Sequence, residues 1–199
     1  FAHDRLAAKV WNLYFLVPTG RGQFVSDITA TQYDEVLASL YRIQRKYDRR
    51  MLVNAKCAPH YIKTVLEHAG TEPDPRIRTY SGGAGGCPAG THYMGIRPNG
   101  DVTPCPYLPV FAGNLRRAAL ADLWTSSGLF TDIRRRSSLG GRCGACEMNN
   151  HCGGCRARAY GMTSDLMAED PLCTHTPGKF VGSPLLALQS PAASGTPGA

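Results

Sequence analysis

Cysteine is the residue type whose spacing in this chain points most directly to chemistry. Five of the eight cysteines form C-x2-C-x5-C-x2-C followed by one more after 17 residues: Cys143, Cys146, Cys152, Cys155 and Cys173. Cys87 and Cys105 lie on either side of a glycine-containing turn, whereas Cys57 stands alone. Each C-x2-C pair lets two thiolates reach one metal centre from a tight turn. In a reducing compartment such crowding indicates metal or redox chemistry rather than disulfide cross-links.

Iron–sulfur ligation, structural zinc and a redox dithiol are the three interpretations of this pattern. Structural zinc sites commonly separate two C-x2-C pairs by about 12 to 20 residues, whereas the spacer here is five. One zinc ion also leaves Cys87, Cys105 and Cys173 without a role, and a thioredoxin-like dithiol explains a single pair. Iron–sulfur clusters need four ligands each and can draw them from one shared run of cysteines. The whole set therefore favours two clusters, with a zinc-binding interaction protein as the weaker alternative.

Length and composition indicate a globular chain. It has 199 residues, of which 43% are hydrophobic and 19% charged, enough for one ordinary domain or two small ones. No apolar run approaches the roughly 18 residues of a membrane span, and FAHDRLAAKV lacks the apolar core of a secretory signal. We expect a cytoplasmic protein without a membrane partner. Because the first residue is Phe1 rather than Met, we also expect a piece of a longer protein.

The net charge of +7 raises the question of a nucleic-acid partner. However, the arginines are spread over the chain and no recognition motif accompanies them, so solvated helix faces explain them better. Thiolates that hold two clusters also offset part of the positive charge. We therefore expect no nucleic-acid partner.

The first 80 residues predict alternating strands and helices. Residues 10–18, VWNLYFLVP, are an almost continuous apolar run typical of a strand buried on both faces. A helix is expected over about residues 31–47, a second strand over 51–56 and a second helix over 59–69. Two such units cannot cover both faces of a parallel sheet by themselves. The expected fold class is therefore α/β, as the C-terminal part of a partial (β/α) barrel.

Residues 81–178 differ in composition and predict an irregular, cysteine-rich α+β domain. Asn99-Gly100 predicts a hairpin with a type I′ turn. Helices are expected over about residues 115–125 and 129–136. Residues 179–199 are rich in Pro, Gly, Ser and Ala without periodicity and are expected to form a disordered tail.

The cysteine pattern resembles a known domain. The series Cys87-x12-Gly100-x4-Cys105, Cys143-x2-Cys146-x5-Cys152-x2-Cys155 and Cys173 is similar to the SPASM extension of radical S-adenosylmethionine enzymes. GNLRRAALADLW, CGACEMNNHCGGCRARAYG and LMAEDPLC resemble the branch with haem-biosynthesis and peptide-modifying members, and WNLYFLVPTGRG with AKCAPHY resembles its late barrel strands. The resemblance implies two auxiliary 4Fe-4S clusters.

The resemblance also implies which residues hold each cluster. The first is held in the family by the hairpin cysteines and the last of the run, here Cys87, Cys105 and Cys155. The second is held by the other three of the run and the distal one, here Cys143, Cys146, Cys152 and Cys173. The fourth ligand of the first cluster has no family counterpart in this chain. Cys57 is a candidate, and the alternatives are an open position or a side chain such as His60, His92 or His151.

Arg156 and Arg158 are the candidate cofactor-binding residues besides the cysteines, because they follow Cys155 closely. A guanidinium there can pair with a substrate carboxylate, such as a porphyrin propionate, or raise a cluster's potential by its charge. Ordinary helix-surface arginines are the alternative.

The C-x3-C-x2-C triplet with which the family binds and cleaves S-adenosylmethionine is absent from this sequence. We therefore expect the full-length parent to be a radical S-adenosylmethionine oxidoreductase or maturase, with that cofactor and a third 4Fe-4S cluster, while this piece alone is inactive. The resemblance implies a haem precursor or a peptide as substrate and flavodoxin or ferredoxin as electron donor. A stand-alone iron–sulfur electron-transfer module is the alternative.

Overall fold

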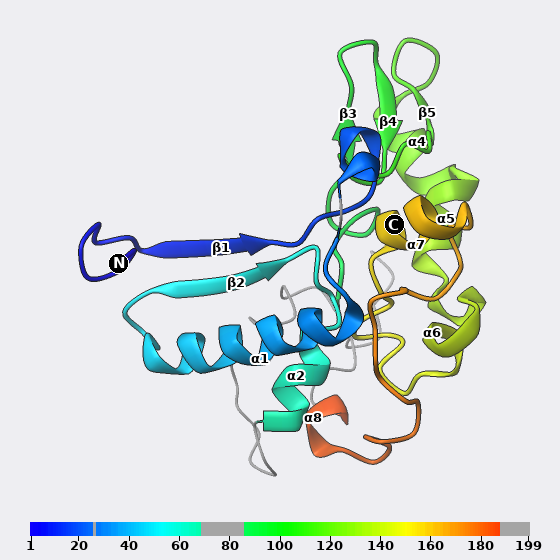
Figure 1. The fold of residues 1–199 in the computed structure, drawn as a ribbon. Coiled ribbons are helices and arrows are strands. Elements are labelled where there is room, and N and C mark those ends of the chain that lie inside the picture. The colour runs from blue at the N-terminus through cyan, green and yellow to red at the C-terminus, as the bar shows by residue number, and fades with distance from the viewer. Residues whose placement is uncertain (26, 69–85, 188–199) are drawn as a thin grey trace, which may run out of the picture.

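The computed structural model describes residues 1–25, 27–68 and 86–187 and shows a mixed α/β chain with two small sheets. Strands β1 (Val10–Tyr14) and β2 (Leu52–Lys56) pair in parallel, with Val10 opposite Leu52 and Tyr14 opposite Lys56. Helices α1 (Ala30–Lys46) and α2 (Tyr61–His68) follow these strands and lie on the same side of the sheet (Figure 1). The predicted order of strand, helix, strand, helix is confirmed.

Helix α1 packs through a stripe of apolar residues at helical spacing. Tyr33, Leu37, Leu40 and Tyr41 are buried in the same core as Val53 of β2 and much of α2. The helix begins with a capping box in which Thr29 and Gln32 exchange side-chain and backbone hydrogen bonds. The start predicted at Thr31 was thus two residues late, because Thr29 supplies the capping oxygen.

Within the described residues, the outer face of the β1–β2 sheet is partly exposed to solvent. Val10 is 50% exposed and Tyr14 is 60% exposed, and β1 alternates between exposed and partly buried positions. The prediction of a strand buried on both faces was therefore wrong, because α1 and α2 cover only one face of this two-stranded sheet. A partial barrel remains a prediction.

The cysteine-rich part is built from short elements with long connections (Figure 1). A three-stranded antiparallel sheet has the order β3 (Gly95–Ile96), β4 (Asp101–Thr103) and β5 (Gly113–Asn114). Four helices follow: α4 (Leu120–Ser126), α5 (Gly128–Arg134), α6 (Gly141–Ala145) and α7 (Arg156–Thr163). A 3-10 turn, η2 (Arg136–Ser138), lies between α5 and α6, and a second one, η1 (Gly20–Phe24), lies between β1 and α1 of the α/β segment.

The β3–β4 hairpin is present, but its turn differs from the prediction. Gly100 donates its N–H to the carbonyl of Arg97 and has a φ of +91°, while Asn99 keeps a negative φ. A type I′ turn needs positive φ at both central residues. The connection is therefore a longer turn that closes on one left-handed glycine, and Asn99 instead binds the Asp101 backbone N–H with its side chain.

The segment predicted as a tail is ordered over its first part. Helix α8 (Pro184–Ala187) lies near α2 in Figure 1, and Phe180 packs against the core. Glu147 accepts hydrogen bonds from the backbone N–H groups of Gly178 and Phe180. The disorder expected for residues 179–187 was therefore wrong, because the half-buried carboxylate of Glu147 anchors the start of this segment, while residues 188–199 lie outside the described part.

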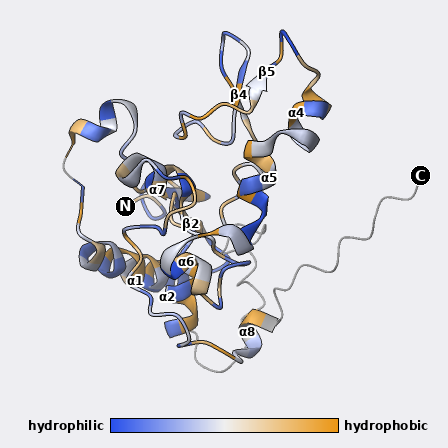
Figure 2. Cartoon of the chain, turned by 90° about the vertical axis from the view of Figure 1, so that its right-hand side faces the viewer, coloured by the Kyte–Doolittle hydropathy of each residue, from blue (hydrophilic) through white to orange (hydrophobic). Residues whose placement is uncertain are grey.

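Figure 2 shows that the helices carry both hydrophilic and hydrophobic residues. Within the described residues, no helix combines the length and apolar composition needed to cross a bilayer.

Candidate metal centres

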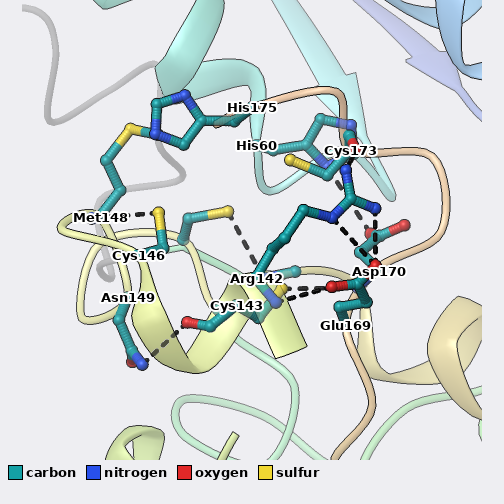
Figure 3. A pocket seen from close by; sticks show the side chains of 13 residues that line it. His60, Arg142, Cys143, Cys146, Met148, Asn149, Glu169, Asp170, Cys173 and His175 are labelled. Carbon is teal, nitrogen blue, oxygen red and sulfur yellow. Dashed lines mark hydrogen bonds and ion pairs between the residues drawn. The ribbon is translucent and has the colours of Figure 1, made fainter. Parts of the chain in front are cut away.

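Four cysteines surround one cavity, which we call the inner site. Cys143 comes from α6, Cys146 and Cys152 from the loop that follows it, and Cys173 from the segment after α7. Figure 3 shows Cys143, Cys146 and Cys173 around this space, together with His60 and His175. The space between them measures about 420 Å³, open solvent at its mouth included. These four thiols are the set that the family resemblance implies for the second cluster.

The other four cysteines line a second cavity, which we call the outer site. Cys87 and Cys105 flank the β3–β4 hairpin, Cys155 is the N-cap residue of α7, and Cys57 follows β2 directly. This cavity is wider, at about 1080 Å³ including its open mouth. All eight cysteines are free thiols. The outer site thus unites the three cysteines assigned to the first cluster with Cys57.

A double-glycine turn sends the last two cysteines of the crowded run to different sites. Gly153 and Gly154 have φ values of +67° and +64°, which only glycine adopts readily. A Cβ atom on Gly153 would overlap the guanidinium of Arg136, and one on Gly154 would lie 3.2 Å from the sulfur of Cys143. The turn therefore directs Cys152 to the inner site and Cys155 to the outer site.

The two sites adjoin at Gly86, which has a φ of +94°. A Cβ atom there would overlap the carbonyl oxygen of Cys152. The backbone just before Cys87 therefore passes against the loop that carries Cys152, and this contact brings the two cysteine sets together.

Backbone N–H groups point at the sulfurs of the inner site. Over 3.4 Å each, Met148 donates to Cys146, Gly154 to Cys152 and Asp170 to Cys143. Burial raises the pKa of the Cys146 thiol to about 11 despite the Met148 donor, and it raises the pKa of Cys105 in the outer site to about 11 as well. Buried thiols with such pKa values ionise when a bound cation replaces their protons.

A family model described as an iron-sulfur cluster-binding domain, SPASM, matches residues 87–155. The chain therefore carries a SPASM domain. It is 37% identical over 177 residues to an AdoMet-dependent heme synthase of Methanosarcina barkeri, covering 87% of this chain and 50% of that protein. It is 38% identical over 182 residues to one of Nitratidesulfovibrio vulgaris, covering 89% and 49%. The chain thus spans about half the length of these relatives.

A shorter similarity connects the chain to a PqqA peptide cyclase of Xanthomonas axonopodis pv. citri. The identity is 32% over 93 residues, which cover 44% of this chain and 25% of that protein. Outside the SPASM match, the similarity to the heme synthases also includes the α/β segment, because their alignments cover almost nine tenths of the chain.

Two contacts place Cys173 of the SPASM protein at the inner site. Arg142 donates to the carbonyl of Cys173 over 2.6 Å and pairs with Glu169 at 2.8 Å (Figure 3). The buried ammonium of Lys63, on α2, binds Thr174 over 2.8 Å and Asp34 over 2.6 Å. The distal cysteine is therefore fixed both to α6 and to the α/β segment.

Arg158 lies between the two sites, fully buried with Asp170. Their ion pair measures 3.2 Å, and Arg158 also donates to the carbonyls of Cys57 over 2.9 Å and Leu16 over 3.2 Å. Asp170 accepts the backbone N–H of Cys155 over 2.8 Å. Both of these cysteine backbone groups belong to the outer set, whereas the backbone N–H of Asp170 donates to the sulfur of Cys143 in the inner set over 3.4 Å. Burial opposes ionisation of Asp170, but His60 and Arg158 keep its pKa below the usual value.

Arg156 and Arg158 both bind the protein itself, and neither is among the residues that line either cavity. Arg156 donates to the carbonyls of Leu166 over 2.9 Å and Ala168 over 2.6 Å, and its Nη2 lies 3.9 Å from the sulfur of Cys143. From this position the positive charge of Arg156 acts on the electrostatic potential of the inner site. The expected pairing with a substrate carboxylate has no support in these contacts.

The three candidate histidines lie in different places. His60 lines the inner site rather than the outer one, and both of its ring nitrogens lack hydrogen-bond partners although it is buried. Its Nδ1 is 3.6 Å from Asp170, and burial lowers its pKa to about 4. His92 is exposed and bonded to Thr91, and His151 is buried but lines neither cavity.

The sequence reasoning missed three polar residues. These are Asp170, which pairs with Arg158, and Glu147 and His175, which pair at 3.0 Å beside Cys146. Their partners are distant in sequence, so spacing gave no signal for them.

Proposed function

We propose that the chain is the auxiliary cluster-binding portion of a radical S-adenosylmethionine enzyme that modifies a haem precursor. The observation that supports this most strongly is the division of the eight cysteines into two adjoining cavities with four thiols each. One structural zinc ion would account for only one of these cavities.

The chemistry of the donor set fits 4Fe-4S clusters. Cys143, Cys146, Cys152 and Cys173 would hold one cluster at the inner site, and Cys87, Cys105 and Cys155 would hold the other at the outer site. Such clusters accept and relay single electrons, at potentials set by burial, charge and hydrogen bonds to sulfur.

The protein's own residues favour the reduced state at the inner site. Backbone N–H groups directed at sulfur stabilise additional negative charge there. The guanidinium of Arg156, 3.9 Å from the Cys143 sulfur, adds a buried positive charge. Buried Arg136 donates to the carbonyl of Cys87 over 3.3 Å and retains a free Nη1, which extends this positive field toward the outer site.

The mouth of the outer site is where we place the substrate. Tyr14, Lys56, Tyr93 and Tyr107 line it beside the cysteines. Three partly exposed aromatic rings and one ammonium group suit a flat, carboxylate-bearing molecule such as a porphyrin precursor. The AdoMet-dependent heme synthases align with almost nine tenths of this chain and the peptide cyclase with less than half, so we favour a haem precursor over a peptide.

The remaining parts of this proposal concern the whole enzyme. S-adenosylmethionine and a third cluster would be bound by a segment with a C-x3-C-x2-C motif, and residues 1–80 would complete its partial barrel. Flavodoxin or ferredoxin would supply electrons. Eight free thiols favour the reducing cytoplasm as its location.

Metal analysis after anaerobic reconstitution tests the proposal. We expect about eight iron atoms and eight acid-labile sulfides per chain, as two four-iron clusters require. One tightly bound zinc ion without broad visible absorption would overturn it. To separate an enzyme from an electron-transfer module, the complete gene product is incubated with reductant and S-adenosylmethionine, and formation of 5′-deoxyadenosine supports the enzyme.

A further inference from the structure

We infer that Cys57, which lies outside the SPASM match, is the fourth ligand of the outer cluster and is held in place by Arg158 and Tyr33. This inference rests on the proposed function, because it requires a cluster bound by Cys87, Cys105 and Cys155. It assigns the one coordination position for which the family pattern offers no cysteine in this chain.

The position of Cys57 at the end of β2 is the first support. Parallel strands present their carboxyl ends to ligand sites, and Lys56 and Cys57 at this end both line the outer cavity with the other three cysteines. The α/β segment thus supplies a thiol to a site whose other thiols come from the SPASM domain.

The backbone of Cys57 is the second support. Its φ is +58°, in the left-handed region that residues with a Cβ atom seldom occupy. Strained residues of this kind concentrate at functional sites, where the surroundings hold them in place.

The surroundings that hold Cys57 are two buried donors on its carbonyl oxygen. Arg158 donates over 2.9 Å and the hydroxyl of Tyr33 over 3.2 Å. The guanidinium of Arg158 also lies over the Tyr33 ring, 5.2 Å from its centre, and is paired with Asp170. Cys57 therefore cannot relax into an ordinary strand conformation without losing these two buried hydrogen bonds.

The other groups near the outer site fit the role less well. His60 lines the inner site, His92 is exposed and His151 lines neither cavity. Tyr93 and Tyr107 line the outer site but are 41% and 40% exposed, and their hard phenol oxygens suit iron of a sulfide cluster less than a thiolate does.

The binding step is an exchange of a proton for iron. The Cys57 thiol releases its proton to solvent, and the thiolate sulfur forms the bond to the fourth iron in place of water. No electron is transferred in this step. With all four iron atoms bound by cysteine, the outer cluster would supply electron relay, and a substrate beside it would not coordinate iron.

Cyanide binding, followed by electron paramagnetic resonance of the reconstituted chain in its reduced and oxidised states, tests the inference. In the wild-type chain we expect cyanide to leave the outer-cluster signal unchanged. In Cys57→Ala we expect either a cyanide-dependent new signal or an oxidised three-iron cluster, because one iron has lost its protein ligand. Cys146→Ala is the matched control and should produce these changes at the inner cluster only.

The outcomes separate this inference from the proposed function. If the wild-type chain binds two clusters and its outer-cluster signal already responds to cyanide, or if Cys57→Ala behaves as wild type, Cys57 is not a ligand although the function stands. If the wild-type chain binds no iron–sulfur cluster, the proposed function itself fails. Arg158→Lys keeps the charge but not the forked geometry, and should make part of the outer cluster responsive to cyanide; an unresponsive variant would contradict the positioning role of Arg158.

Discussion

Removal of the buried Arg158 guanidinium should lower the free energy of unfolding more than any other single substitution considered below. The substitution Arg158→Met retains most of the side chain's apolar volume but deletes its charge. It leaves the carboxylate of Asp170 buried without its 3.2 Å partner and removes a donor from the carbonyls of Cys57 and Leu16.

The size of the effect follows from burial. Both side chains of the Arg158–Asp170 pair have no exposed surface, and breaking a buried ion pair from one side typically costs about 3–5 kcal/mol. The hydrogen bonds to the two carbonyls overlap with this figure rather than adding to it. We therefore expect the free energy of unfolding to fall by about 3–5 kcal/mol.

Urea unfolding of the cluster-free chain under reducing conditions, followed by circular dichroism, measures this loss. The double variant Arg158→Met/Asp170→Asn removes the unpaired charge as well, so it should recover at least about 2 kcal/mol relative to the sum of the single losses. A loss below about 1 kcal/mol in Arg158→Met, or full additivity in the double variant, would refute the view that this buried ion pair stabilises the fold.

Three further predictions concern the loops and the buried histidine. Gly86→Ala should lower the free energy of unfolding by at least about 2 kcal/mol, because it combines left-handed strain with overlap on the Cys152 carbonyl; an unchanged urea midpoint would disprove the close approach. Glu147→Gln should lower the free energy of unfolding by about 2 kcal/mol, because the carboxylate accepts hydrogen bonds from two backbone N–H groups and contacts His175. Residues 178–187 of this variant should also exchange their amide hydrogens faster than those of the wild type. Burial lowers the pKa of His60 from 6.5 to about 4, so the unfolded state binds the proton first. The cluster-free chain should therefore lose about 3 kcal/mol between pH 6.5 and pH 4, a loss absent from His60→Gln, and equal slopes for the two proteins would contradict it.

The elements of the α/β segment could be predicted from sequence because their signals are local. Strand and helix periodicities around Val53 and Tyr33 each lie within one window of the chain. The burial of β1 could not be predicted in this way. Its apolar run indicates what the strand can bury, whereas exposure of Tyr14 depends on which elements cover the sheet.

The grouping of the cysteines depended on the family resemblance rather than on spacing. Spacing alone does not show that Cys155 leaves its neighbours, because that depends on the left-handed conformations of Gly153 and Gly154. Asp170 shows the same limit of local reasoning. Its partners Arg158 and His60 are distant in sequence, and only the folded chain brings these three buried groups together.

The most direct test of two separate clusters compares two pairs of cysteine substitutions. Iron, sulfide and zinc are measured in the reconstituted wild-type chain, in Cys87→Ala/Cys105→Ala and in Cys143→Ala/Cys146→Ala. We predict about eight iron atoms in the wild type and about four in each double variant, with a different paramagnetic signal lost in each. Loss of all iron from either variant in a chain that remains folded, or zinc in place of iron in the wild type, would contradict the assignment of one cluster to each cavity.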